Sequence, residues 1–442
     1  MSPWKAVIIV ILTTAPAFAE ELTFQQAVDR MMRQNPVLAQ QNYSSRIAEK
    51  QLHTTQSGYL PQLDFIQSWS RSDNPVYVFG SLLNQQRFTA KNFAIDSLNQ
   101  PEALSDYVSK LQMGWLIYDF GRRENRVSSA RSGYRIATLQ EQAFVVSLLQ
   151  QLVRRYYSVS LAWLRLEVTD EALKSAQARL EQARERVQQG MVVQSDLLSA
   201  EVFVASRTQE NIEARHQHLL AVAGLQEILG NTEAANFNTA DLKEKQFAEY
   251  DLASWREELN AHRAELKIVK EVQQLAGDQV ASERSDFLPS LQAWSAYEWH
   301  GTSLSYSGEN WGAGLELRWN LFRGFSDALQ FSAAKLMQKS AQEKIRETEN
   351  ALWLQLQTGY YGYQSAKEKW KVAVAAVQHA SENRRIYAER YASGLVTIQD
   401  SLQAETAYKE ARLMLSQNIY EMYVAYADLL AAAGKVEELK NL

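Results

Sequence analysis

The sequence predicts a mainly α-helical protein with a β-barrel portion, in which one arrangement of long helices and strands is built twice in tandem. The stretch Glu185–Glu201, with Gly190 near its centre, recurs 204 residues later as Glu389–Glu405, with Gly394 in the same place. Long runs that are poor in Gly and Pro precede both copies, which favours long helices. Two segments in each half alternate apolar and polar residues, which is typical of strands with one apolar face.

The first residues have the pattern of a secretory signal peptide. Residues 1–19 contain Lys5, then a short apolar run, then Ala17-Phe18-Ala19 before Glu20. The apolar run is much shorter than the ~20 residues that a transmembrane helix needs, so a membrane anchor is the weaker alternative. After this signal peptide we predict four parts, which are a first structural repeat over 20–230, a connector over 231–250, a second repeat over 251–434 and a short C-terminal tail over 435–442.

Each half is expected to contribute two strands of about ten residues, which is the length that crosses a bilayer when tilted. The predicted strands begin at Gln62, Tyr107, Leu291 and Trp311, and the last of them runs to Leu321. Trp and Tyr near the strand ends fit the aromatic girdle of an outer-membrane barrel. A soluble β-sandwich is the alternative, but four strands close no barrel alone, so several chains would share one. The loop over 72–106 is long, whereas its counterpart at 301–310 is short.

The helices are expected to form a coiled-coil tube. The run over 122–189 would be roughly 100 Å long as a helix, and its two apolar stripes indicate neighbours on both sides. The run over 325–392 repeats it, with Gly359 and Gly362 as expected bends. After each tip glycine an Asp can cap a return helix, over 195–229 and 397–433. The leading helices are expected over 22–55, with Thr23 as cap and an interruption at Pro36, and over 251–284.

Composition and motifs argue against catalysis. The chain has no cysteine, which excludes disulfides, a thiol nucleophile, Cys-based metal sites and a lipid-modified cysteine. Its six histidines are scattered and are expected on the solvated surface. No phosphate-binding loop, nucleophile elbow or zinc-protease motif is present, and the net charge of -5 does not suggest nucleic-acid binding. We therefore expect no enzyme activity and no cofactor or metal.

Together these features resemble the outer membrane efflux protein family, the TolC-like channels. The resemblance covers the mature chain and rests on the duplicated halves, the two Gly-containing tips, the Leu60-Pro61 and Leu288-Pro289 strand starts, and the aromatic strand ends at Trp115–Tyr118 and Trp319–Phe322. It implies a homotrimer in the outer membrane of a Gram-negative bacterium, with a twelve-stranded barrel in lipid and a helical tube across the periplasm. The tips would close the tube and dock a periplasmic adaptor protein, which links to an inner-membrane pump of the RND or ABC type.

The resemblance also assigns roles to residues of the tips. Gly190, Met191, Gly394 and Leu395 match the positions that dock the adaptor.

Four further residues match, or stand at, positions of the periplasmic gate. Asp400 matches a pore-facing Asp, Tyr391 the tip Tyr, and Asp196 a first-half Asp that helps to latch the closed state. Two positions depart from the pattern, because Gln403 stands where a second Asp is expected and Val396 where a basic latch residue is expected. A single ring of Asp400 from three chains would still favour cations.

The expected function is thus a passive exit duct for efflux or type I secretion, which exports small molecules or polypeptides. Two alternatives remain at this point. A stand-alone outer-membrane diffusion porin would conduct without partners, and a secreted coiled-coil structural protein would be recovered in a soluble fraction.

Overall fold

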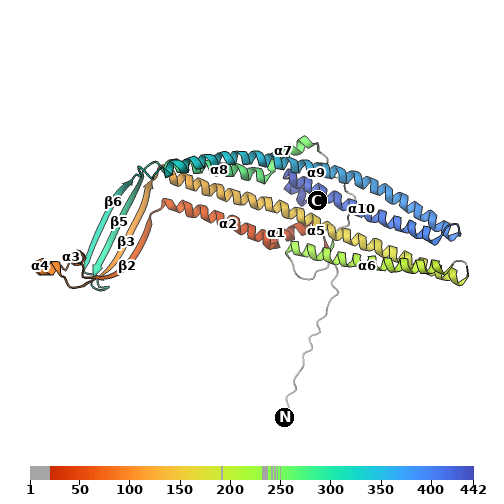
Figure 1. Ribbon diagram of the computed structural model, residues 1–442, viewed down its shortest axis with the longest axis horizontal. Helices are drawn as coiled ribbons and strands as arrows, with labels where there is room; N and C mark the ends of the chain where they lie inside the picture. Colours follow the sequence, from red (N-terminus) through yellow and green to blue (C-terminus); the bar gives the residue numbers. More distant parts are fainter. Residues whose placement is uncertain are drawn as a thin grey trace, which may run out of the picture. The chain divides into compact units, whose positions relative to one another are not determined.

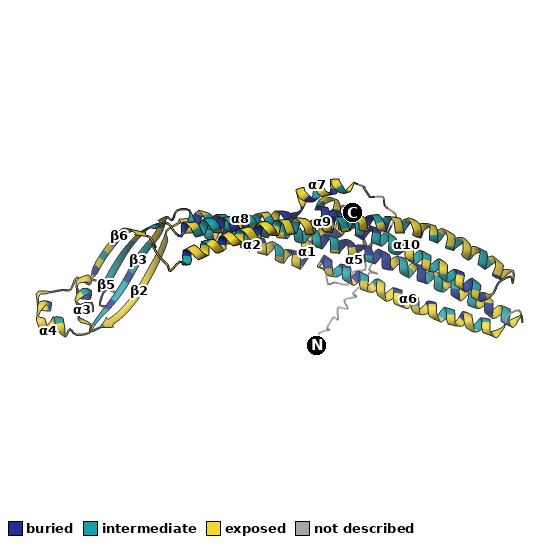
Figure 2. Cartoon of the chain, turned by 45° about the horizontal axis from the view of Figure 1, so that its top comes forward, coloured by how far each residue is buried: buried dark blue, intermediate teal, exposed yellow. Residues whose placement is uncertain are grey.

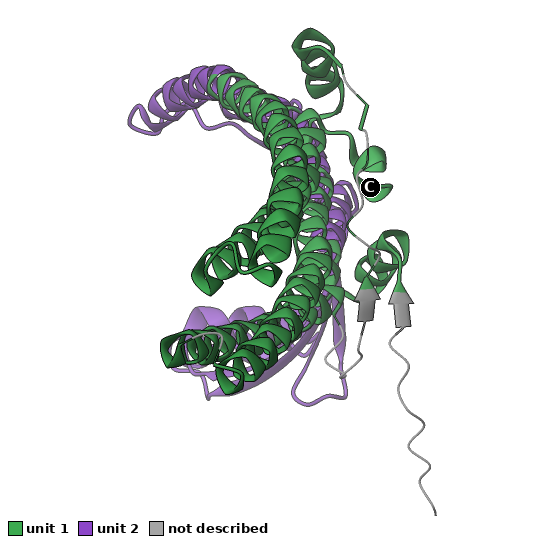
Figure 3. Ribbon diagram, turned by 90° about the vertical axis from the view of Figure 1, so that its right-hand side faces the viewer, with its two compact units in different colours: residues 1–43, 139–266, 347–442 green, residues 44–138, 267–346 purple. Residues whose placement is uncertain are grey.

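The computed structural model describes residues 20–190, 193–230, 237–239, 242, 245, 247–248 and 250–442 (Figure 1). The expected signal peptide, Met191 and most of the 231–250 connector lie outside these residues. The chain divides into two compact units (Figure 3). Unit 1 comprises residues 1–43, 139–266 and 347–442, and unit 2 comprises residues 44–138 and 267–346. Long helices with one four-stranded antiparallel sheet confirm the predicted mainly α architecture.

Unit 2 contains that sheet, whose strands lie side by side in the order β2-β3-β5-β6 (Figure 1). Their bounds are Gln62–Ser72 for β2, Leu104–Tyr118 for β3, Ser290–Gly301 for β5 and Gly308–Arg318 for β6. All neighbours are antiparallel, and the register places Phe65 opposite Leu111, Leu111 opposite Tyr297, and Tyr297 opposite Trp311. The predicted alternation therefore puts one row of large apolar residues across the sheet.

The apolar face of this sheet is exposed, and much of the sheet is coloured as exposed or intermediate in Figure 2. Leu63 and Phe65 on β2 are 66% and 65% exposed, and Trp311 and Leu315 on β6 are 78% and 69% exposed. Apolar side chains gathered on one open face mark a surface that contacts lipid or another protein. The two outer strands, β2 and β6, also leave one edge each without a strand partner within the described residues.

The long loop between β2 and β3 has structure of its own. It contains α3 (Pro75–Asn84), the 3₁₀ turn η2 (Ala90–Phe93) and α4 (Ile95–Asn99). Gln85, which is fully buried, donates to the backbone oxygen of Ser105 over 3.0 Å and to Asp106 Oδ1 over 2.9 Å. The end of α3 is thereby fastened to the start of β3.

The predicted extension of the last strand to Leu321 is wrong, because β6 ends at Arg318. Just beyond the strand, the indole Nε1 of Trp319 donates to the backbone oxygen of Phe287 over 3.1 Å. The first half makes the same contact, from Trp115 Nε1 to the backbone oxygen of Tyr59 over 2.9 Å. Tyr59 ends the 3₁₀ turn η1 (Ser57–Tyr59). Because Trp115 lies inside β3, which continues to Tyr118, this hydrogen bond holds the base of the sheet in both halves but does not by itself end a strand.

The four long helices reproduce the predicted lengths. Helices α5 (Arg122–Gln188) and α9 (Ser326–Ala392) have 67 residues each, and α6 (Gln194–Leu229) and α10 (Ile398–Ala433) have 36 each. Helix α9 runs through Gly359 and Gly362 without interruption. At Gly359 an added Cβ would lie 3.2 Å from the Cα of Leu429, so the absence of a side chain lets α10 approach closely.

The leading helices are α1 (Phe24–Gln34) and α2 (Pro36–Gln56) in the first half, and α7 (Leu252–His262) and α8 (Ala264–Ser285) in the second. The capping of α1 by Thr23 and the interruption before Pro36 are confirmed. The single helix expected over 251–284 is wrong, because the chain breaks at Arg263 with the same backbone angles as Asn35. Buried Arg263 donates to the backbone oxygen of Ala431 and, over 2.8 Å, to Gln355 Oε1.

Each of these two breaks packs on the glycine that ends a return helix. Asn35 Nδ2 donates to the backbone oxygen of Ile228 over 2.8 Å, at the last turn of α6. Gly230 ends α6 with a φ of 77°, and an added Cβ would lie 2.4 Å from the backbone oxygen of Gln34. Gly434 ends α10 with a φ of 79° and lies against His262 in the same way, with an added Cβ 3.1 Å from that backbone. Both glycines are required by conformation and by space.

The core of unit 1 is aromatic around Leu22 and Phe24. Strand β1 (Glu20–Leu22) pairs in parallel with β4 (Phe237–Thr239), two short strands that the sequence did not predict. Fully buried Tyr156 of α5 donates from its hydroxyl to the backbone oxygen of Leu22 over 2.7 Å, and its ring packs on Phe24.

The predicted tail contains the short helix α11 (Val436–Lys440). None of the described helices has an apolar stretch long enough to cross a bilayer.

Candidate functional site: the hairpin tips

The duplicated glycines, Gly190 and Gly394, are exposed and lie in turns that follow the long helices α5 and α9. Gly190 has a φ of 69° and Gly394 a φ of 72°, and the space around both is open. At the second tip the backbone N–H of Gly394 donates to Tyr391 O over 3.1 Å, and that of Leu395 to Arg390 O over 2.9 Å. These bonds satisfy the last carbonyls of α9 and leave the Leu395 side chain 74% exposed. The predicted helix–turn–helix tip is therefore present at Gly394, whereas at the first tip the chain continues from Gly190 into Met191 and Val192, which lie outside the described residues.

The predicted capping role of the Asp residues is wrong in position. Thr397 is the N-cap of α10, and Asp400 is three residues later, where its carboxylate accepts from the Thr397 backbone N–H over 3.0 Å. This reciprocal pair is a capping box. Helix α6 has Val193 at the N-cap, without a side-chain cap, and Asp196 at the third helical position. Hydrogen bonds from Thr397 lower the pKa of Asp400, so this carboxylate is charged at neutral pH.

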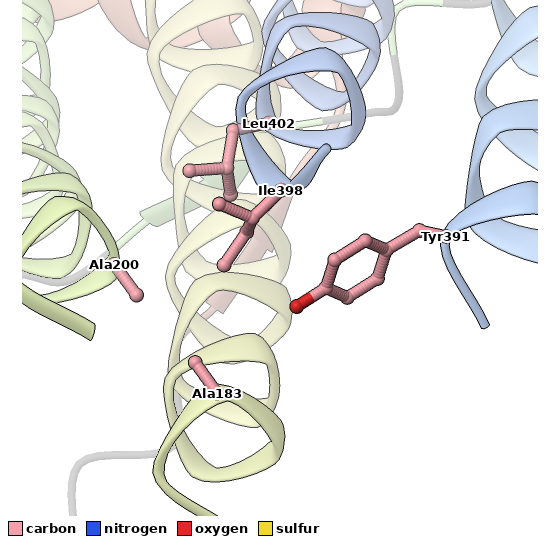
Figure 4. Packing of buried hydrophobic residues seen from close by; sticks show 5 residues of the cluster. All are labelled: Ala183, Ala200, Tyr391, Ile398 and Leu402. Carbon is pink, nitrogen blue, oxygen red and sulfur yellow. The ribbon is translucent and has the colours of Figure 1, made fainter. Parts of the chain in front are cut away.

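An apolar cluster lies behind the turns and joins all four long helices (Figure 4). Tyr391 reaches from the end of α9 towards Ile398 and Leu402 of α10, Ala183 of α5 and Ala200 of α6. All five side chains are at most 5% exposed, in a region where both hairpins are otherwise largely solvated. We call these five residues the tip cluster. Leu180, Phe203 and Val396 pack against it partly buried.

Arg186 connects the α5–α6 hairpin to the α9–α10 hairpin, a contact that the sequence did not predict. From α5, its guanidinium donates to the backbone oxygens of Tyr391 and Ala392 over 3.2 and 3.3 Å, and its Cζ lies 4.6 Å from the centre of the Tyr391 ring. A cation at the last carbonyls of α9 also interacts favourably with the helix dipole. The available signal was the repeat itself, because Arg390 occupies the corresponding position of the second copy.

The other predicted gate residues are not joined to this cluster by polar contacts. Gln403 is exposed and lines a groove between α6 and α10 with Leu198 and Thr406. Among the described residues, the Asp196 carboxylate has no hydrogen-bond or ion-pair partner. The structure therefore brings Tyr391 into the centre of the tip and leaves Asp196, Asp400 and Gln403 around it.

The Tyr391 hydroxyl is buried and, within the described chain, has no hydrogen-bond partner. Because an unpaired buried polar group costs roughly 1–3 kcal/mol, we expect Tyr391→Phe to raise the free energy of unfolding by up to about 1 kcal/mol. Thermal unfolding followed by helical circular dichroism would measure this, with Tyr361→Phe, an exposed tyrosine of the same helix, as the control. A loss of stability instead would show that the hydroxyl has a partner outside the described residues.

The expected surface position is wrong for His300. Its side chain is buried, with Nδ1 3.1 Å from Asp106 Oδ2 and Nε2 3.4 Å from Glu298 Oε2. It is the only histidine with two carboxylate contacts among the residues that the structure describes. Across the same residues, no three His, Asp or Glu side chains are grouped so that they could hold a metal ion.

Comparisons with known proteins agree with this architecture. The model of the family described as outer membrane efflux protein matches residues 27–231 and 255–435. The chain is 25% identical to the alkaline protease secretion protein AprF of Pseudomonas aeruginosa over 350 residues, which are 75% of this chain and 70% of AprF. It is 20% identical to protein CyaE of Bordetella pertussis over 341 residues, or 76% of this chain and 72% of CyaE.

Solved structures share the fold. The CmeC outer membrane channel of Campylobacter jejuni superimposes with a TM-score of 0.79 at 19% identity, over 94% of this chain and 89% of CmeC. The open state of the MtrE outer membrane channel of Neisseria gonorrhoeae gives a TM-score of 0.76 at 16% identity, over 93% and 88% of the two chains. With both halves matched by one family model, the chain belongs to the outer membrane efflux protein family and is located in the outer membrane of a Gram-negative bacterium.

Proposed function

We propose that the protein is the outer-membrane exit duct of a tripartite efflux or type I secretion system. It acts as a homotrimer, in which three copies of the β2-β3-β5-β6 sheet form one twelve-stranded barrel. The hairpin tips close the periplasmic end, and a periplasmic adaptor docks on them and connects the duct to an inner-membrane pump. The chain itself carries out no catalytic step, because the pump supplies the energy.

The observation that carries this proposal is the open sheet. Its exposed apolar face suits lipid, but lipid leaves no water to satisfy the free backbone groups of β2 and β6. Pairing β2 of one copy with β6 of the next satisfies both edges. Since transmembrane barrels need at least about eight strands, one copy is too few, and three copies give twelve.

The tip cluster favours a gate at the ends of the two hairpins. It joins α5 and α6 to α9 and α10, so any movement of one hairpin away from the other must expose its apolar side chains. Val396, which stands where a basic latch residue was expected, packs against this cluster. We infer that apolar contacts hold the closed state of this chain, together with the Arg186 contact, in place of an Asp–Arg latch. Adaptor binding would favour the open arrangement of the tips.

We place the docking surface at the tip of each hairpin, with Gly190 and Met191 at the first tip and Gly394 and Leu395 at the second. Leu395 is the best-defined candidate for contact with the adaptor. It is an exposed leucine on a turn that two backbone hydrogen bonds hold, and such a side chain is a suitable anchor for a partner helix. The charged Asp400 carboxylates of three copies would favour cations at the constriction. AprF is described as a protease secretion protein, which supports polypeptides as one class of cargo.

Photo-crosslinking in cells tests the proposal. A photoreactive amino acid is placed at Leu395, and at Leu354 as a control, because Leu354 is also an exposed leucine but lies in the middle of α9. We expect position 395 to capture a periplasmic adaptor and position 354 to capture none. The genomic neighbours of that adaptor would identify an RND or ABC pump and hence small molecules or polypeptides as cargo.

The opposite result is equally informative. If the trimer is intact in the outer membrane and neither position captures an adaptor, docking at the tip is refuted. Conductance of the purified protein without partners would then favour a stand-alone diffusion porin.

A further inference from the structure

A small cavity with basic walls lies between the four long helices of unit 1, and neither the gate nor the docking surface uses it. Its volume is about 40 Å³. It is lined by Val168, Glu171, Ala172 and Ser175 of α5, Phe203 and Arg207 of α6, Arg384 of α9, and Glu405, Tyr408, Lys409 and Arg412 of α10. A buried water needs only ~10–15 Å³ of such space, so the cavity has room for one small ion.

Glu171 and Glu405, which line this cavity, and Glu210 beside it already have cationic partners. Glu210 accepts from Arg207 Nη1 over 2.7 Å and from Lys409 Nζ over 2.9 Å. Burial raises the pKa of Glu210, but these hydrogen bonds outweigh burial and the pKa is lowered, so the group is charged at neutral pH. Glu405 accepts from Arg179 over 2.7 Å, and Glu171 accepts from Arg412.

The cations outnumber these carboxylates. Five cationic side chains meet three carboxylates here, which leaves an excess of positive charge at a partly solvated site, where the side chains of Arg384 and Glu171 are 39% and 53% exposed. Like charges that are held close together destabilise one another unless a counterion lies between them.

Arg384 is the cation with the weakest partner. Its Nη1 is 4.0 Å from Glu405 Oε2, which is too long for a hydrogen bond. Its guanidinium is nevertheless fixed, because Cζ lies 4.0 Å from the centre of the Tyr408 ring. Arg412 approaches the same ring, with Cζ at 5.8 Å. A guanidinium has five N–H donors and an ammonium three, so Arg384, Arg412 and Lys409 all keep donors beyond their observed contacts.

We propose that this cavity binds one small inorganic anion, of the size and charge of chloride, between Arg384, Lys409 and Arg412. The anion accepts the spare N–H donors and neutralises part of the positive excess. Because Arg412 and Lys409 are also ion-paired to Glu171 of α5 and Glu210 of α6, the bound anion strengthens the attachment of the α9–α10 hairpin to the α5–α6 hairpin.

Chloride NMR tests the site directly on the purified full-length protein in detergent. Chloride is titrated at constant ionic strength with gluconate as the replacement, because gluconate is too large for the cavity. We expect saturable broadening of the chloride resonance, which bromide reverses. In Arg384→Gln the affinity should fall about tenfold or more, since a charge-assisted contact is lost.

Arg385→Gln is the matched control. Arg385 is next in sequence and exposed, and it pairs only with Glu382 and Glu389 of its own helix among the described residues. The affinity of the Arg385→Gln protein for chloride should equal that of the unmodified protein. Arg412→Gln provides a second variant, and bromide anomalous scattering from crystals of the unmodified protein gives an independent position for the ion.

Two results would overturn the proposal. One is the absence of saturable broadening in the unmodified protein. The other is broadening that persists at full strength in both Arg384→Gln and Arg412→Gln, which would place the anion elsewhere.

Discussion

Replacing Gly230 with alanine will destabilise the protein by about 2–5 kcal/mol, the largest effect that we expect from a single methyl group. A non-glycine residue in the left-handed region costs roughly 1–2 kcal/mol, and overpacking against a fixed neighbour costs a further ~1–3 kcal/mol. Here the neighbour is backbone, since the new Cβ would lie 2.4 Å from the oxygen of Gln34 and cannot be relieved by a side-chain rotation. Denaturant or thermal unfolding followed by circular dichroism measures the loss.

Alanine substitutions at two other glycines separate the conformational cost from the cost of overpacking. Gly190 has nearly the same φ, 69° against 77°, but open space around it, so Gly190→Ala reports the conformational cost alone. Gly133 lies inside α5 with open space and no positive φ, so Gly133→Ala should stabilise the helix by roughly 0.5–1 kcal/mol. If Gly230→Ala is no more harmful than Gly190→Ala, the close packing of α6 on the break between α1 and α2 does not contribute to stability.

If the tip cluster holds the closed state as we propose, shortening Leu402 to alanine will shift the channel towards its open state. Leu402 is 5% exposed in the tip cluster, and a buried Leu→Ala change costs ~2–5 kcal/mol. If opening separates the hairpins, most of that cost falls on the closed state, so the ratio of closed to open channels should fall by at least about tenfold. Single-channel recording in planar bilayers, without adaptor, measures the ratio as open probability.

Leu354→Ala makes the same chemical change on α9 at a leucine that is 64% exposed, and it should leave the open probability unchanged. Leu402→Met keeps most of the buried volume and should also behave like the unmodified protein. An open probability that is equal in Leu402→Ala and in Leu354→Ala would show that the tip cluster does not hold the gate closed.

Local sequence signals were sufficient for most elements. The runs poor in Gly and Pro predicted α5 and α9 almost to the residue, and the alternation around Leu111 and Leu315 predicted β3 and β6. The glycines that end α6 and α10 were evident because only a residue without a side chain adopts positive φ easily. Each of these signals depends on neighbours within about one turn of helix or one strand.

The errors arose where distant residues decide. No proline marks the break between α7 and α8 in the sequence. Arg263 at this break instead makes long-range contacts with Ala431 and Gln355, which local sequence patterns do not reveal. The buried position of His300 depends on Asp106, which is 194 residues away. At the tip, the family pattern directed attention to charged residues, whereas the buried contacts of Tyr391 come from alanines and aliphatic residues that no motif distinguishes.

The open edges of the sheet have a consequence for the biogenesis of the duct. If the sheets of several copies form the proposed barrel, a lone subunit cannot enter lipid without exposing the unpaired backbone of β2 and β6, so insertion has to follow or accompany the association of its copies. In the proposed ring every copy supplies one edge to each neighbour, so one defective edge would leave the whole ring unclosed. An allele with proline in the middle of β2 should therefore be dominant over the normal allele when both are expressed in one cell.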